Sequence, residues 1–143
     1  TLDLTKNYLS VLPAEVSLLT DLQQIIIRGN EIQALPSGLG TLSSLEHIVL
    51  DPQSTHLKSP PPEIIREGAA AIVEYLKEIH QAKRTREIDM SSMGLITVPL
   101  ELTYTVGLEK LILANNANKM LPLSIRNLTQ LFLDQDEIRI ARK

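Results

Sequence analysis

The feature of this sequence that most constrains its fold is a recurrence of apolar residues and prolines every 23 residues. Leu22 and Leu45 are separated by this spacing, and so are Pro99 and Pro122 in the downstream half. A repeat of this length predicts short structural units that stack on one another. One unit alone cannot cover its apolar face, so neighbouring units must bury it.

Each unit follows the pattern L-x-x-L-x-L-x-x-N, then an apolar residue and Leu-Pro. The L-x-L portion predicts a short strand whose alternate residues point inward. Six strand-bearing units are expected to start near Leu2, Leu22, Leu45, Thr85, Leu108 and Leu128. The Asn, as in Asn30 and Asn116, is expected where the chain leaves the strand. There its amide can bond backbone groups that would otherwise be buried without a partner.

This pattern resembles the leucine-rich-repeat family over most of the chain. The resemblance implies an α/β fold: a leucine-rich-repeat solenoid with a parallel concave sheet and one long inserted helix. Met93 departs from the pattern, because it stands at an Asn position and its side chain cannot donate a hydrogen bond.

Residues 51–84 break the period. From Pro62 to about Lys83 the apolar residues have helical spacing, and prolines precede or open the segment, as they can at a helix N-terminus. Gly68 could interrupt the first turns of this helix. The predicted organisation is a first repeat block at 1–61, a helical return segment or spacer at 62–84, and a second block at 85–143. The two blocks could be separate arrays, or the helix could be an enlarged return segment within one solenoid. We favour one continuous solenoid, because a helix that ends close to the next strand closes a turn in the usual way.

The segment from Ser59 to Ile65, Ser-Pro-Pro-Pro-Glu-Ile-Ile, sharpens the resemblance. It is similar to segments that close the repeat array in intracellular leucine-rich-repeat proteins, including Ras-group repeat proteins and Roco-type GTPases. Such a resemblance implies protein partners, including small GTPases or their regulators. In this chain further repeats follow the segment, and the sequence contains no phosphate-binding G-x-x-x-x-G-K-[ST] loop.

The composition of the chain excludes several classes of function. The formal net charge is −3, and nucleic-acid binding would require a basic face. No apolar run approaches the length of a membrane span. The chain has no cysteine, which excludes a disulfide framework and cysteine zinc sites and favours a cytoplasmic location.

The outward positions of the predicted strands are the candidate partner-binding residues, since the resemblance implies that ligands bind the concave face. Apolar residues at the strand centres would form an exposed stripe of the kind that marks partner sites. The alternative is that β-branched residues simply suit strands. Arg28 and Asp51 could steer a charged partner or form an ordinary surface ion pair. The candidates are Ile26, Arg28, Val49, Asp51, Asp89, Ile112, Phe132 and Asp134.

Neither a catalytic site nor a metal or cofactor site is expected. The three histidines, His47, His56 and His80, lack metal-ligand spacing, and Ser91 has no histidine in register to activate it. The sequence therefore predicts a non-catalytic protein-binding scaffold in cytoplasmic signalling, without nucleic-acid or membrane partners. The alternative is a regulatory repeat segment of a larger multidomain GTPase or kinase.

Overall fold

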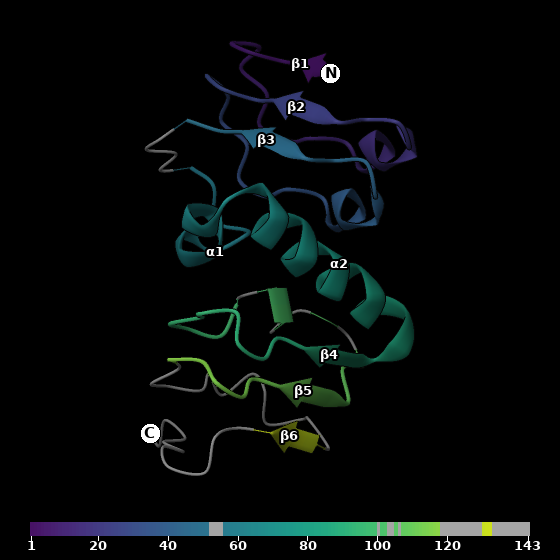
Figure 1. Ribbon diagram of the computed structural model, residues 1–143, viewed down its shortest axis with the longest axis vertical. Coiled ribbons are helices and arrows are strands. Elements are labelled where there is room, and N and C mark those ends of the chain that lie inside the picture. The colour runs from purple at the N-terminus through teal and green to yellow at the C-terminus, as the bar shows by residue number, and fades with distance from the viewer. Residues whose placement is uncertain (52–55, 100, 103–104, 106, 118–129, 133–143) are drawn as a thin grey trace. The chain divides into compact units, whose positions relative to one another are not determined.

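The computed structural model describes residues 1–51, 56–99, 101–102, 105, 107–117 and 130–132, the last three by their backbone alone (Figure 1). The chain divides into two compact units, unit 1 (Thr1–Lys77) and unit 2 (Glu78–Lys143). Unit 1 contains β1 (Leu2–Asp3), the 3₁₀ helix η1 (Ala14–Leu18), β2 (Gln24–Ile26), the 3₁₀ helix η2 (Ser37–Thr41), β3 (His47–Val49) and α1 (Pro62–Glu67). Helix α2 (Ala69–Thr85) runs across the boundary, and unit 2 continues with β4 (Glu87–Asp89), β5 (Lys110–Ile112) and β6 (Gln130–Phe132).

The predicted fold class is wrong. The described strands form two separate parallel sheets, ordered β1-β2-β3 and β4-β5-β6, with neither a closed sheet nor a solenoid sheet among them. The fold is therefore a small mixed one and not a leucine-rich-repeat solenoid. The physical reason is the interruption of the 23-residue spacing between β3 and β4. The chain forms two helices there, so no described strand pairing extends one sheet into the other.

In unit 1 the three strands pair in register at the repeat spacing. Ile25 lies beside Leu2 on one side and beside Ile48 on the other. The Ile25 side chain is fully buried, whereas its neighbours in β2 are half-buried. This alternation gives the sheet one face toward the core and one face toward solvent. The 3₁₀ helices η1 and η2 pack against each other on the return side of the units.

The predicted single helix over residues 62–83 is two helices, α1 and α2, and the break falls at Gly68. This glycine has φ 96° and ψ −172°, a backbone conformation that is open almost only to glycine. Prolines open α1, with Pro61 as the N-cap and Pro62 in the first turn, where a missing N–H costs no helical hydrogen bond. In unit 1, α2 buries Ile72, Tyr75 and Leu76.

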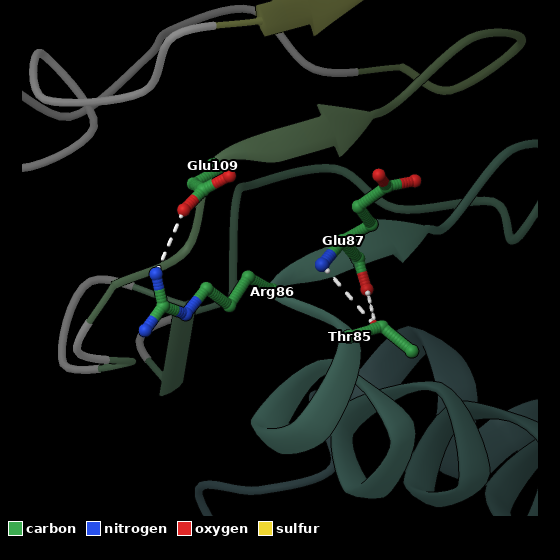
Figure 2. Close-up of polar contacts among 4 residues, drawn as sticks. All are labelled: Thr85, Arg86, Glu87 and Glu109. Atoms are coloured by element: carbon green, nitrogen blue, oxygen red, sulfur yellow. Dashed lines mark hydrogen bonds and ion pairs between the residues drawn. The ribbon is translucent and has the colours of Figure 1, made fainter.

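In unit 2, β4 begins two residues after α2 ends (Figure 2). Between them Arg86 adopts a left-handed backbone conformation with φ 60°. Its carbonyl accepts hydrogen bonds from the N–H groups of Glu109 and Lys110, at 2.8 and 3.2 Å. The Thr85 hydroxyl closes the turn by donating to the carbonyl of Glu87 at 2.9 Å. The buried residues of this sheet include Ile88 and Leu111, which pair in register.

The predicted role of the repeat Asn is confirmed at two positions. The Asn30 amide donates to the carbonyls of Leu4 and Ile27 at 2.8 and 3.0 Å, and its oxygen accepts the Leu9 N–H at 2.9 Å. Asn116 makes the same three contacts in unit 2, with Met90, Leu113 and Leu95. Each Asn thus joins two successive repeats by satisfying backbone groups of both.

The two units therefore repeat one structure at an offset of 86 residues, as from Asn30 to Asn116. The backbone bond from Lys6 N–H to the Arg28 carbonyl recurs as that from Ser92 N–H to the Ala114 carbonyl. The left-handed backbone of Lys6 recurs at Ser92, and further pairs of positive φ follow at Tyr8 and Gly94 and at Gly29 and Asn115. Within the described residues, no helix is both long and apolar enough to cross a membrane.

Candidate functional site

The solvent-directed face of each sheet is the candidate site. The alternation of inward and outward residues places every second strand residue on it, because successive side chains of a strand point to opposite faces. We call the solvent-directed face of the β1-β2-β3 sheet the unit 1 face. It consists of Asp3, Thr5, Gln24, Ile26, Arg28, His47, Val49 and Asp51. The unit 2 face consists of Glu87, Asp89, Ser91, Lys110, Ile112 and Ala114. None of these side chains is classed as fully buried.

At the centre of the unit 1 face, Ile26 lies in register between Asp3 and Val49. Ile26 and Val49 are both half-buried, so each keeps part of its aliphatic surface in contact with water. Two adjacent aliphatic side chains beside a carboxylate form a surface that can contact an apolar group and a hydrogen-bond donor of the same partner.

Arg28 and Asp51 do not form an ion pair in the described structure. The Arg28 Nε donates to the carbonyl of Leu50 at 3.3 Å, and an Asp51 carboxylate oxygen accepts the N–H of Gly29 at 2.8 Å. Both side chains therefore bond the backbone of a neighbouring repeat. Instead of an ion pair with each other, Arg28 and Asp51 each make a hydrogen bond to the backbone. Their role in binding a partner stays a prediction.

The first strand of each face ends in the same carboxylate turn. Asp3 accepts hydrogen bonds from the Thr5 hydroxyl and N–H, at 2.5 and 2.9 Å. Asp89 accepts the same pair of bonds from Ser91, also at 2.5 and 2.9 Å. These bonds, the hydroxyl's first, lower the pKa of both aspartates below their ordinary value, because they stabilise the ionised form. Both exposed groups are therefore held as oriented anions at neutral pH.

The unit 2 face has the same arrangement around Ile112, which is half-buried and lies in register beside Asp89. On this face the Lys110 ammonium lies 3.6 Å from a Glu87 carboxylate oxygen. Lys110 also lowers the pKa of Asp89 through its charge, although this effect is smaller than that of the Ser91 bonds. A second ion pair, between Arg86 and Glu109 at 2.9 Å, lies at the start of the sheet (Figure 2).

One further predicted residue, Phe132, lies in β6, the last strand of the second sheet. The backbone register places Phe132 of β6 beside Ile112. Asp134 lies outside the described residues. Because the strands belong to two sheets, the predicted residues fall on the faces of two different sheets. Ile26, Arg28, Val49 and Asp51 share the first, and Asp89 and Ile112 share the second.

Two features of this surface were not predicted from the sequence. Asp89 was predicted only as a partner-binding residue and Asp3 was not among the candidates, although the spacing Asp-x-Thr and Asp-x-Ser is the signal for a side-chain turn. The exposed apolar side chains of the first repeat were also not predicted, and of these Tyr8 is 83% exposed and Leu18 75% exposed. These residues occupy loop and 3₁₀ positions for which the repeat pattern carries no expectation of direction.

Within the described part of the chain, the side chains form no group of three or more His, Asp or Glu residues able to hold a metal ion. His47 and His56 are exposed, and His80 on α2 is half-buried. The Ser91 hydroxyl donates to Asp89. A scan of known protein families finds none that matches this chain.

Proposed function

We propose that this chain is a non-catalytic protein-binding module, and that its contact surfaces are the unit 1 face and the unit 2 face. The observation that carries the proposal is the aliphatic centre of each face, Ile26 with Val49 and Ile112. Single exposed apolar side chains are ordinary on protein surfaces, but Ile26 and Val49 lie side by side on neighbouring strands, and contiguous apolar surface marks contact sites. Hydrogen-bonded parallel strands also hold these side chains in fixed positions, which reduces the entropy lost on binding.

The proposed partners are proteins of the cytoplasm, with small GTPases or their regulators among them. The absence of cysteine favours a reducing compartment, and the formal charge of −3 argues against a nucleic-acid partner. The polar residues around each aliphatic centre would supply specificity, as the rim of an interface does.

The test replaces the three aliphatic residues by threonine, which keeps the β-branched shape and the strand propensity while reducing the apolar surface. The triple variant Ile26→Thr, Val49→Thr and Ile112→Thr is compared with the unaltered chain by capture from cytosol, with quantitative mass spectrometry of the retained proteins. We expect proteins retained by the unaltered chain to be depleted about tenfold or more, because central apolar contacts contribute most to binding.

The matched control is Val11→Thr, which changes an apolar residue that is 68% exposed and lies on neither face. It should leave the captured proteins unchanged. Circular dichroism melting of each variant checks that the fold is retained. If the triple variant is folded and captures the same proteins in the same amounts, the faces are not the contact surfaces.

A further inference from the structure

The two faces match each other in residues that the core does not constrain. At the 86-residue offset Asp3 corresponds to Asp89, Thr5 to Ser91, and Ile26 to Ile112. Inward leucines recur because each unit must fill the same core. Outward residues are less constrained, since substitutions on a solvated surface have small effects on stability. The Asp and the hydroxyl recur in both units as one turn, and this turn places a carboxylate beside an outward Ile on each face.

The shared geometry places a negative charge next to an aliphatic side chain. Register pairing sets Asp3 beside Ile26 in unit 1 and Asp89 beside Ile112 in unit 2. The hydroxyl and N–H bonds described above hold both carboxylates in one orientation. Within the described structure neither carboxylate takes part in an ion pair, since the Lys110 ammonium pairs with Glu87 instead. Each face thus presents an oriented anion outside any described ion pair, although on the unit 2 face the charge of Lys110 also acts on Asp89.

We propose that the unit 1 face and the unit 2 face are two separate binding sites for the same kind of partner, a helical segment that presents a cationic side chain in line with aliphatic ones. This inference rests on the proposed protein-binding function and specifies the chemistry and number of its sites. The cation complements Asp3 or Asp89, and the aliphatic side chains cover Ile26 or Ile112 and the residue beyond.

The row of residues across each sheet indicates the form of the segment. The row runs from Asp3 through Ile26 to Val49, and in unit 2 from Asp89 through Ile112 to the position of Phe132. Neighbouring strands lie about 4.8 Å apart. Side chains four residues apart on a helix are separated by about 5–6 Å, whereas alternate residues of an extended chain are separated by roughly 6.6 Å. A helix crossing the strands therefore matches the row more closely than an extended peptide.

The test uses a defined probe, an alanine-based helical peptide with one arginine followed by leucines four and seven residues later. Isothermal titration calorimetry of the full chain should give a stoichiometry of about two peptides per chain. Asp3→Asn and Asp89→Asn should each weaken one of the two sites by about tenfold or more, because the coupling energy of a close interfacial charge pair is of that size. Asparagine can still accept the bonds from Thr5 or Ser91, so each turn is retained.

Two controls accompany the test. Asp21→Asn removes an exposed carboxylate that lies on neither face, and should leave both sites unchanged. A peptide with glutamate in place of arginine should bind about tenfold or more weakly. Binding of one peptide per chain, or loss of all binding in either single aspartate variant, overturns the proposal of two equivalent sites. Equal binding of the glutamate peptide, or no binding of the arginine peptide, overturns the proposed chemistry. None of these results decides the proposed protein-binding function, because the capture experiment with the threonine variants tests that function separately.

Discussion

The half-buried side chain of Asn30 makes several hydrogen bonds that join neighbouring repeats of unit 1. It bonds the carbonyls of Leu4 and Ile27 and the N–H of Leu9, so it satisfies backbone groups from two repeats. Asn7 stands one repeat earlier at the equivalent position. Among the described residues its side-chain amide donates one hydrogen bond, to the exposed carbonyl of Thr5 at 3.2 Å. The same residue type at the same repeat position therefore has different energetic weight, according to how many backbone groups of neighbouring repeats it satisfies.

This difference leads to a stability prediction. Asn30→Ala should lower the free energy of unfolding by about 3 kcal/mol, because it leaves part-buried backbone groups unpaired at about 1–3 kcal/mol each. Asn7→Ala should lower it by only about 0.5 kcal/mol, since the exposed Thr5 carbonyl can bond water instead. Urea denaturation followed by circular dichroism gives both values. Equal losses for the two variants would show that the cross-repeat bonds of Asn30 contribute nothing particular.

Among the elements, α2 shows how the interruption of the repeat is accommodated. Its backbone passes so close to η2 that a Cβ built on Gly40 would overlap the Lys77 nitrogen and lie 2.5 Å from the Lys77 Cα. Glycine at position 40 thus allows the helix to approach the 3₁₀ segment directly. The residues of α2 that are buried in unit 1 depend on this approach, because a displaced helix would expose them.

The close approach predicts that Gly40→Ala is destabilising. We expect a loss of about 3 kcal/mol in the free energy of unfolding, because the methyl group meets backbone atoms that cannot move aside without shifting the helix. The neighbouring Thr41→Ala is the control, and it should cost about 1 kcal/mol through the lost bond from its hydroxyl to the Gly38 carbonyl, which is 2.8 Å long. Thermal melts of the two variants provide the comparison, and a Gly40→Ala variant as stable as Thr41→Ala would contradict the packing described.

At the scale of the whole molecule, two units with the same hydrogen-bonding scheme each have their own buried leucines. Leu39 in unit 1 and Leu111 in unit 2 are both 0% exposed. Each belongs to a unit with its own sheet, because the described strand pairings stay within a unit. Covalently, α2 joins the two units, and its residues fall on both sides of the boundary.

Two compact units, each with its own sheet, predict separate local stabilities. Leu111→Ala should lower the stability of unit 2 by about 3 kcal/mol, the usual cost of a cavity at a fully buried leucine. Native-state hydrogen exchange should then show faster exchange of amides in β4 and β5 than in β2 and β3. Leu39→Ala should give the opposite pattern. A uniform increase over all strands in both variants would mean that the units unfold as one.

The sequence by itself determined the local geometry of this protein. Its 23-residue period places Leu22 and Leu45 in equivalent positions, and the strands that follow them pair at that same spacing. Inward and outward residues follow from the alternation, so Ile26 and Ile112 could be assigned to a solvent-directed face. The role of Asn30 could also be predicted, because an amide beside an emerging strand has few other partners. These features depend on contacts between neighbouring repeats, which a periodic pattern encodes directly.

Only the tertiary structure decided how the repeats are grouped. The sequence favoured one solenoid with one concave sheet, whereas the described strands form two sheets, and the candidate residues lie on two faces. The approach of α2 to Gly40 depends on packing between segments far apart in sequence. A periodic pattern shows only which residues recur. Whether one sheet continues into the next depends on the structure of the segment between β3 and β4. That segment has no repeat from which its structure could be predicted.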